Sequence, residues 1–367
     1  MKLIIIFTFI FISLSSASTF YVGTTKGHGI FFSNLNTNTG ELSSFNLGVS
    51  INRPSFLVID KKKKILYSTN LNSWKEPGSL VSYKIQKDLT LKEISKTSSM
   101  GINPCHISLN PTKNILLSVN YNGPVSTSSY LISPSGFLSS SISNKEHFGK
   151  GVHPIRQKKP HAHSVFSHPL YPYVYVADLG SDAIFIYRLD QISGELFFIK
   201  KENISGESMG PRHMKWDKKG EFLYVVNELN PSLTIFKYYE NGRIKEITNI
   251  NALPKEINKN GLTAAEIRVH PSKPFIYISI RDKNNKGGNY ISIFKMDGLS
   301  SYLIDTVKSK VDFPRNFNID PSGKWMLIAG QKSKDIAVFL INKNGTISYK
   351  NKRYSFPGEP VCIEFLD

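Results

Sequence analysis

Seven repeated units constrain the fold of this chain more than any other feature of its sequence. In six of them a short apolar run ends in a turn and a second run, richer in β-branched residues, follows: FLVIDKKKKILYSTN, HISLNPTKNILLSVN, HSVFSHPLYPYVYVAD, HMKWDKKGEFLYVVNE, EIRVHPSKPFIYISIRD and NFNIDPSGKWMLIAGQ. The seventh unit is split between the chain ends, with VCIEFLD at the C-terminus and TFYVGT near the N-terminus. A repeat of about 40 to 50 residues with strand-like content is typical of a β-propeller.

The register of the units predicts which side chains meet at the centre of the propeller. Aligning the turns gives one equivalent position in each unit, occupied by Ser55, Cys105, His163, Arg212, Ala265, Arg315 and Cys362. A third strand such as AIFIYRL, a turn with Gly or Asp and a short outer strand complete each unit. We therefore predict an all-β, seven-bladed propeller of four-stranded antiparallel blades. The N- and C-terminal strands close one blade, which removes exposed sheet edges.

The first 18 residues have the pattern of a signal peptide. Residues 1–2 are Met-Lys, residues 3–12 are apolar, and residues 13–18 are mostly small, with Ala17 near a plausible cleavage point. The apolar run is too short to span a membrane. We expect a leader over residues 1–18, one propeller domain over residues 19–367, and a periplasmic or secreted protein without stable membrane insertion after cleavage. An uncleaved anchor is the alternative.

The charge of the chain favours a small anionic partner. The formal net charge is +18 at pH 7, but the lysines are spread over turns and outer strands, so we expect no nucleic-acid partner. A positive field still attracts an anionic small molecule.

Cys105 and Cys362 lie on blades separated by another blade, and a disulfide bridge needs Cα atoms within about 7 Å. This favours free thiols, with a disulfide as the alternative.

One insertion, NKEHFGKGVHPIRQKKPHAH, lengthens the interval between the second and third units. Its basic and imidazole side chains are His147, Lys150, His153, Arg156, Lys158, Lys159 and His161. Because it directly precedes an inner strand, we expect it at the rim of the channel. It is either a lid that gathers anions or a polar surface loop.

Candidate site residues come from strand ends that converge on the channel mouth. The inner strands contribute His163, Arg212 and Arg315, and the ends of the next strands contribute Asn70, Asn120, Asp178, Glu228, Arg281 and Gln331. Arginine is rarely buried unpaired, so three arginines in one funnel need carboxylates or an anionic ligand. A ligand site is favoured because propeller pockets lie where strand ends converge. An ion-paired network between blades is the alternative.

Metal and nucleophile chemistry find less support. His161 and His163 form an H-x-H pair, and Glu228, Asp178 and Asn120 offer oxygen ligands. The arginines would repel a divalent cation from the same cavity, so we expect no metal and no cofactor. The chain has no G-x-S-x-G sequence. Adjacent strand residues such as Cys105 and His106 point to opposite faces and cannot act together.

Two segments resemble signature blades of the seven-bladed-propeller lactonases, GPRHMKWDKKGEFLYVVNELNPSLTIFKY and FPRNFNIDPSGKWMLIAGQKSKDIAVFLI. That family includes propeller-type 6-phosphogluconolactonase and carboxymuconate lactonising enzyme, and HPIRQKKPHAHSV is similar to a stretch of many bacterial members. The resemblance covers Thr19 to Asp367. It implies that His163, Arg212, Glu228 and Arg281 carry activity and that Arg315 contacts an anion.

We therefore expect metal-independent hydrolysis of a sugar lactone, 6-phosphogluconolactone or a related aldonolactone. In this hypothesis Arg212 and Arg281 stabilise the oxyanion and His163, in preference to Glu228, takes the proton from water. Substrate-binding residues would be Arg315, His161, Asn120, Asp178 and Gln331. A carboxymuconate-type cycloisomerase and a non-enzymatic binding propeller are the alternatives. Because phosphogluconolactone is a cytoplasmic intermediate, the leader favours a different lactone for an exported member.

Overall fold

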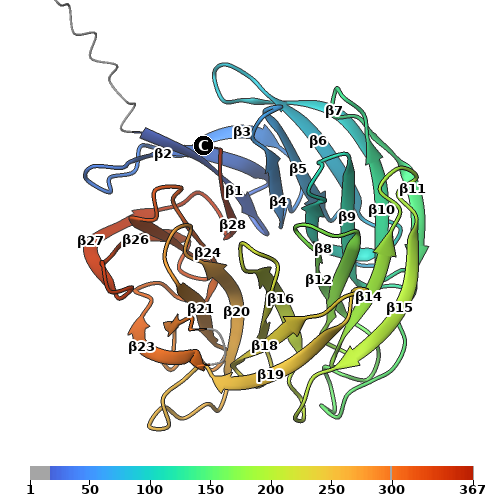
Figure 1. Cartoon of the computed structure of the whole chain (residues 1–367). Coiled ribbons are helices and arrows are strands. Elements are labelled where there is room, and N and C mark those ends of the chain that lie inside the picture. The colour runs from blue at the N-terminus through green and yellow to red at the C-terminus, as the bar shows by residue number, and fades with distance from the viewer. Residues whose placement is uncertain (1–16, 298–299, 367) are drawn as a thin grey trace, which may run out of the picture.

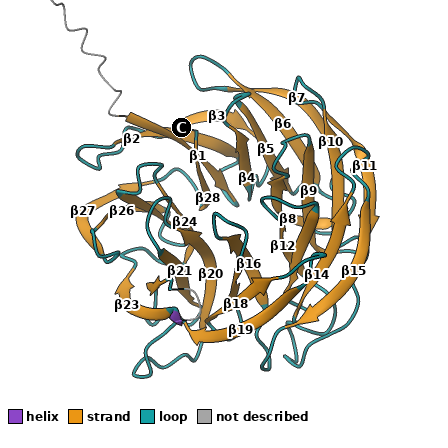
Figure 2. Cartoon of the chain, in the orientation of Figure 1, coloured by secondary structure: helices purple, strands orange, loops and turns teal. Residues whose placement is uncertain are grey.

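Seven β-sheets stand side by side in a ring around a central channel in the computed structural model (Figure 1). The structure describes residues 17–297 and 300–366. Each sheet is a blade of four antiparallel strands. Apart from one short helical turn at Ser300, these residues form strands and loops (Figure 2). The predicted all-β, seven-bladed propeller is confirmed.

Six blades are continuous in sequence and run from the innermost to the outermost strand. Blades 1 and 2 consist of β4 (Leu57–Asp60), β5 (Ile65–Asn70), β6 (Ser79–Ile85) and β7 (Leu91–Ser98), then β8 (Ile102–Leu109), β9 (Ile115–Asn122), β10 (Thr127–Ile132) and β11 (Leu138–Lys145). Blades 3 and 4 consist of β12 (Ala162–Ser167), β13 (Tyr173–Asp178), β14 (Ala183–Leu189) and β15 (Leu196–Asn203), then β16 (Pro211–Trp216), β17 (Phe222–Asn227), β18 (Ser232–Tyr238) and β19 (Ile244–Asn251). Blades 5 and 6 consist of β20 (Leu262–Val269), β21 (Phe275–Asp282), β22 (Tyr290–Lys295) and β23 (Tyr302–Lys308), then β24 (Pro314–Ile319), β25 (Trp325–Gly330), β26 (Asp335–Ile341) and β27 (Ile347–Ser355).

Blade 7 joins the two ends of the chain. Its strands are β28 (Pro360–Phe365), β1 (Ala17–Thr24), β2 (Gly29–Asn36) and β3 (Asn46–Ser50), in that order from the channel outward. β28 pairs antiparallel with β1, so the predicted closure is confirmed. Residues 1–16 of the predicted leader lie outside the described residues, and Ala17 and Ser18 extend β1 opposite β2. Within residues 17–297 and 300–366, no helix has the length and apolar character needed to cross a bilayer.

The core lies between neighbouring blades, because each sheet buries both faces against the next. The second strands are the most enclosed, and β5 and β25 are buried at every position. Outer strands such as β15 are largely exposed. Between blades 4 and 5, for instance, Val226 and Leu233 pack with Ile267 and Ile278. Each fully buried side chain of this size stabilises the fold by about 1.5–3 kcal/mol.

Polar side chains also tie each blade to the next. The His270 Nε2 of blade 5 donates to the carbonyl oxygen of Gly323 in blade 6 at 2.9 Å. The Tyr277 hydroxyl donates to the Gly345 carbonyl at 2.9 Å. The same two contacts join blades 3 and 4. They lock the angle between neighbouring blades and hold the strand ends in a constant arrangement around the channel.

A bulge at the start of four innermost strands singles out the residue that faces the channel mouth. The pairing registers skip Cys105, His163, Arg212 and Arg315. A bulge re-aims the side chain of its extra residue. Cys105, His163 and Arg315 line the cavity at the channel mouth, whereas Arg212 is fully buried. Their equivalence, expected from the repeat, is borne out by the pairing.

The closing blade differs from the predicted register by one residue. The shift in β28 lies between Pro360 and Cys362, so Val361 takes the bulged position. Cys362 lies one position deeper, where its Sγ accepts the Leu57 N–H at 3.3 Å. The equivalence of Cys362 with Cys105 was therefore wrong. Val361 and Cys362 are both apolar, so the sequence gives no sign of which of the two residues occupies the bulge. Both cysteines are free thiols.

Candidate active site

A cavity of about 550 Å³ opens at the channel mouth. This volume lies in the range of about 300–1,000 Å³ that small-molecule sites occupy. Of the predicted site residues, His163, Glu228, Arg281, Arg315 and Gln331 lie on its wall. The wall thus takes residues from blades 3 to 6, and loops of other blades complete it.

Glu228 is the centre of the charge network. Its Oε1 accepts from Arg156 Nη2 at 3.0 Å, and its Oε2 accepts from Arg212 Nε at 2.9 Å and lies 3.2 Å from Arg281 Nη2. Burial by itself raises the pKa of Glu228, but Arg281, Arg212 and Arg156 outweigh it and hold the pKa well below its usual range. Glu228 is therefore a carboxylate at neutral pH. The single negative charge of Glu228 is therefore shared by three guanidinium groups.

Arg281 and Arg315 carry the unbalanced positive charge of the wall. Arg281 donates from Nη2 to the Ala264 carbonyl, whereas its Nε is buried without a partner among the described residues. Within the same part of the chain, Arg315 makes no hydrogen bond and no ion pair. Burial lowers the pKa of Arg281 to about 9 and that of Arg315 to about 10. A buried guanidinium donor without a partner on Arg281 and a partly buried, unpaired Arg315 favour an anionic ligand in the cavity.

Arg212 lies directly behind the wall and not on it. The residue is only 1% exposed. Besides Glu228, its guanidinium contacts the Ala265 carbonyl through Nη1 at 2.6 Å and the His213 ring at 3.1 Å. The side chain predicted to stabilise the oxyanion is thus held in place by several protein groups.

His163 presents a neutral imidazole to the cavity. Its Nδ1 is buried with no hydrogen-bond partner in the described part of the chain. The ring meets Tyr121 and His213 edge to face, with centroids 5.6 Å and 5.3 Å away. Burial, with help from Arg212 and His213, holds the pKa of His163 well below its usual value. Such a ring is uncharged at neutral pH and has a nitrogen free to accept a proton.

Comparison with known proteins decides the family. A sequence model described as "Lactonase, 7-bladed beta-propeller" matches residues 19–365. The chain belongs to the seven-bladed β-propeller lactonase family. The resemblance seen in the two signature blades is confirmed, and the activity of this lactonase is that of a carboxylic-ester hydrolase acting on a lactone.

Individual relatives cover nearly the whole lactonase. A 6-phosphogluconolactonase of Bacillus subtilis is 29% identical over 356 residues, which is 94% of this chain and 97% of that protein. A solved structure of a putative 6-phosphogluconolactonase from Bacteroides fragilis is 26% identical with a TM-score of 0.86, and the match covers 97% of this chain and 99% of that one. The fold is shared with a periplasmic gluconolactonase of Pseudomonas aeruginosa, which is 24% identical with a TM-score of 0.87 and coverage of 96% and 99%.

Three predicted substrate-binding residues of the lactonase do not reach the cavity wall. Asn120 donates from Nδ2 to the carbonyl oxygens of Ser99 and Val125. Its position near the end of the second strand of blade 2 is as predicted, but its side chain bonds to the backbone of nearby loops. The Asn120 side chain is short, so its amide bonds to neighbouring backbone and does not extend into the channel.

Asp178 and His161 are used in the same structural way. Asp178 accepts from His147 Nδ1 at 2.7 Å and from the His161 backbone N–H at 2.8 Å. The His161 ring donates from Nδ1 to the Tyr121 carbonyl oxygen at 2.7 Å and stacks on the Tyr121 ring. These contacts fix the insertion onto blade 3 through Asp178 and onto blade 2 through Tyr121. Gln331, by contrast, lies on the wall, within 3.4 Å of Thr25 and Glu359 oxygens.

The insertion contributes one residue to the site itself. Arg156 crosses the mouth of the lactonase to Glu228, and its Nε and Nη2 donate to the Tyr121 hydroxyl at 3.2 Å and 2.9 Å. His147 is instead buried, stacked on Phe185 at 3.7 Å. The insertion thus acts as a strap at the mouth, and only part of its basic content faces the ligand space.

Sequence reasoning missed several wall residues. Tyr121 directly follows Asn120, so extending each strand end by one residue would have found it. Arg53 and Trp74 lie on loops of blade 1, where the Arg53 guanidinium stacks over the Trp74 ring at 5.3 Å. No repeat marks loop residues of this kind. In the described residues no group of three or more His, Cys, Asp or Glu side chains is arranged to hold a metal ion.

Proposed function

We propose that this lactonase hydrolyses an anionic sugar lactone, 6-phosphogluconolactone or a related aldonolactone, without a metal ion. The observation that carries the proposal is the surplus of guanidinium groups around one carboxylate, with Arg315 unpaired on the wall. A phosphate or carboxylate on the substrate would balance that charge. The names of the Bacillus subtilis and Bacteroides fragilis relatives support the same substrate class.

The reaction needs a proton acceptor and a site for developing negative charge. Water attacks the lactone carbonyl, His163 takes one proton from that water, and the carbonyl oxygen becomes an oxyanion. Arg281, whose Nε has no partner among the described residues, and the buried Arg212 stabilise this charge. The bond from the carbonyl carbon to the ring oxygen then breaks, and the proton returns to that oxygen. A proton acceptor contributes about 100- to 10,000-fold in rate and an oxyanion donor about 100- to 1,000-fold.

The remaining cations suit the distal anionic group. Among the described residues Arg315 has no partner for its donors, and Arg53 also lies on the wall. Lys26 lies there too, but it is paired with Glu359 at 3.0 Å. A guanidinium binds phosphate or carboxylate oxygens through two parallel hydrogen bonds. In this proposal Arg315 is the principal contact of the substrate's phosphate or carboxylate, and Arg53 adds positive field at the rim.

Two features support water attack without a metal. The donor side chains that would hold a cation are not clustered among the described residues. Arg156, Arg281 and Arg315 on the same wall also repel a divalent cation. The charge stabilisation that a metal would supply is already present as guanidinium.

The test is a hydrolysis screen with matched phosphorylated and unphosphorylated sugar lactones, with and without chelator, after subtraction of spontaneous opening. We expect faster turnover of the phosphorylated lactone and no effect of chelator. Equal or faster turnover of uncharged lactones would reject the anionic substrate, and loss of activity with chelator would reject metal independence. Ultraviolet loss of a muconate diene would indicate the cycloisomerase instead.

We also propose that the protein is exported to a periplasm or secreted. The support is the sequence of residues 1–18, which has a basic start, an apolar run and small residues. Mature protein recovered from the exporting cell should begin near residue 19 by N-terminal sequencing. Full-length chain in the cytoplasm would reject export. Export would favour an aldonolactone other than the cytoplasmic phosphogluconolactone, which the same screen distinguishes.

A further inference from the structure

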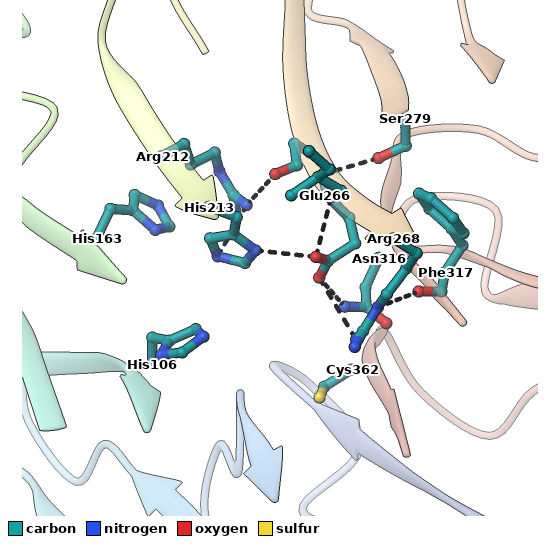
Figure 3. A network of polar contacts seen from close by, with 12 residues as sticks. His106, His163, Arg212, His213, Glu266, Arg268, Ser279, Asn316, Phe317 and Cys362 are labelled. Atoms are coloured by element: carbon teal, nitrogen blue, oxygen red, sulfur yellow. Dashed lines mark hydrogen bonds and ion pairs between the residues drawn. The ribbon is translucent and has the colours of Figure 1, made fainter. Parts of the chain in front are cut away.

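A second layer of polar side chains lies beneath the cavity, and the reaction proposed above assigns these side chains no role. It consists of residues next to the bulges, among them His106, His213, Glu266 and Asn316 (Figure 3). Each of these four is at most 4% exposed. Buried polar groups at this depth need partners, and their pairing shows what the layer does.

His213 connects this layer to the active site. In Figure 3 its ring stands between Arg212 and Glu266. Arg212 Nη1 lies 3.1 Å from His213 Nε2, and His213 Nδ1 lies 3.2 Å from Glu266 Oε1. A guanidinium can only donate, so Nε2 is the unprotonated acceptor. Nδ1 therefore carries the proton and donates it to the carboxylate.

Glu266 is itself held from two blades. Its Oε2 accepts from Asn316 Nδ2 of blade 6 and lies 3.7 Å from Arg268 Nη2 of its own strand. Its Oε1 also accepts the Ile267 backbone N–H at 3.0 Å. The acceptor that selects the His213 tautomer is thus rigid, because both of its oxygens are occupied.

The other end of the chain of contacts reaches the reacting site. Arg212 Nε donates to Glu228 Oε2 at 2.9 Å, and the same oxygen lies 3.2 Å from Arg281. With Nη1 bound to Ala265 and His213, the guanidinium of Arg212 is restrained at two of its three nitrogens. The orientation of the Glu228 carboxylate follows from the orientation of Arg212.

We propose that His213 and Glu266 are positioning residues for lactone hydrolysis, which hold Arg212, and through it Glu228, in the geometry that the reaction uses. The inference rests on the proposed function, since it concerns the same site. The groups facing His213 are Arg212, Glu266 and Lys215, together with the rings of His106 and His163, each at 5.3 Å. Burial, reinforced by Arg212, lowers the pKa of His213 to about 4, which keeps its Nε2 an acceptor at neutral pH.

Three variants test the role by kinetics on 6-phosphogluconolactone or whichever lactone the wild type hydrolyses. His213→Phe keeps a ring but removes both nitrogens, and it should lower kcat on the order of 10- to 100-fold, the effect of a small misplacement of reacting groups. His213→Gln retains an acceptor oxygen for Arg212 and should stay within a few-fold of wild type. His106→Phe is the matched control. Among the described residues His106 has no hydrogen bond to Arg212 or Glu266, and its ring packs against Phe56, Phe166 and His213, contacts that a phenyl ring can keep; its kcat should be unchanged.

The pattern of losses separates positioning from general destabilisation. Equal kcat for His213→Phe and His106→Phe, or equal losses for His213→Phe and His213→Gln, would overturn the proposal. Nitrogen NMR of the uncomplexed wild type, with the His213 signals identified from their loss in His213→Gln, reads the tautomer without substrate. We expect the Nδ1-protonated form, and the Nε2-protonated form would overturn the proposal. If no lactone is turned over, the proposed function fails while the tautomer still tests the contacts of His213.

Discussion

At the scale of single residues, the site is defined by which charges are paired. Glu228 is held by three guanidinium groups, whereas Arg315 in the same cavity has no partner among the described residues. Arg315 is partly buried. A charge that is partly removed from water and left unpaired costs stability, and a protein retains one where a ligand compensates for it. Arg315 is therefore the residue whose removal separates function from stability most clearly.

Replacing Arg315 with Met should weaken binding of a phosphorylated lactone without unfolding the protein. Loss of a charge-assisted contact of about 1.5–3 kcal/mol raises KM roughly 10- to 100-fold, with a smaller effect on kcat. The free energy of unfolding should stay equal or rise, because an apolar side chain of similar length replaces an unpaired cation. Steady-state kinetics and urea unfolding measure the two effects. Arg188→Met, on the third strand of blade 3 and stacked on Phe197, is the control and should leave KM unchanged.

At the scale of elements, the site depends on how neighbouring blades are joined. Bulges re-aim residues of the innermost strands toward the channel, while hydrogen bonds at the turns join blades 5 and 6. The turn glycines that accept these bonds pack against aromatic rings of the neighbouring blade. A Cβ at Gly345 would approach Phe275 ring carbons to 2.5 Å, so this close approach requires glycine.

Removing one such bond should cost stability and leave chemistry intact. Tyr277→Phe deletes the hydroxyl that donates to the Gly345 carbonyl, and a buried hydrogen bond of this kind contributes about 1 kcal/mol. We expect a loss of that size in the free energy of unfolding, with kcat unchanged. Tyr302→Phe serves as the control because Tyr302 is 54% exposed. Equal losses for both variants would show that the inter-blade bond contributes nothing.

At the scale of the whole molecule, the ring is closed by hydrogen bonds and packing between its two ends. β28 pairs with β1 from Phe20 opposite Phe365 to Gly23 opposite Cys362. Deleting residues 360–367 should abolish cooperative folding and cause aggregation, because it exposes the edge of β1 and opens the wall of the channel. Circular dichroism and size-exclusion chromatography would show this.

Moving the closing strand β28 to the N-terminus tests whether pairing with β1 is what the fold requires. Since Leu366 N donates to the Thr19 carbonyl oxygen at 2.8 Å, residues 360–366 placed before residue 17 through a short Gly/Ser linker should form a hairpin and restore the fold. A truncated protein that folds as well as the complete chain would contradict the role of closure.

The stability of the whole molecule should fall in mild acid. Burial is the main cause that lowers the pKa of His106, His163 and His213 in the folded state. The unfolded chain then binds more protons below its ordinary histidine pKa of about 6.5. The stabilising contribution is complete above that pH and is lost as the pH falls toward the folded-state values, by up to about 1.4 kcal/mol per pH unit for each histidine.

Urea unfolding at pH 7.5, 6.0 and 5.0 measures the slope of the free energy of unfolding against pH. His106→Phe should reduce it by about one proton, because one of the three buried imidazoles is gone. An unchanged slope in that variant would exclude His106 from the acid sensitivity. The acid limb of kcat/KM should likewise lie well below pH 6.5, since His163 stays neutral down to its lowered pKa.

The sequence by itself determined the architecture and the positions of the central residues. Seven units in register predicted the blades, their closure by the chain ends, and His163, Glu228, Arg281 and Arg315 at one mouth. This succeeds because strand register is a local property that a repeat displays directly. The main error, Cys362, came where an apolar pair gave no sign of which residue bulges.

Only the tertiary structure decided where the side chains point and what they touch. Asn120, Asp178 and His161 turn to nearby loops, Arg156 reaches across from the insertion, and Arg212 withdraws behind the wall onto Glu228 and His213. These contacts join blades far apart in sequence and depend on rotamers and loop paths. No periodicity encodes them, because each is settled by the space and partners that the closed ring leaves.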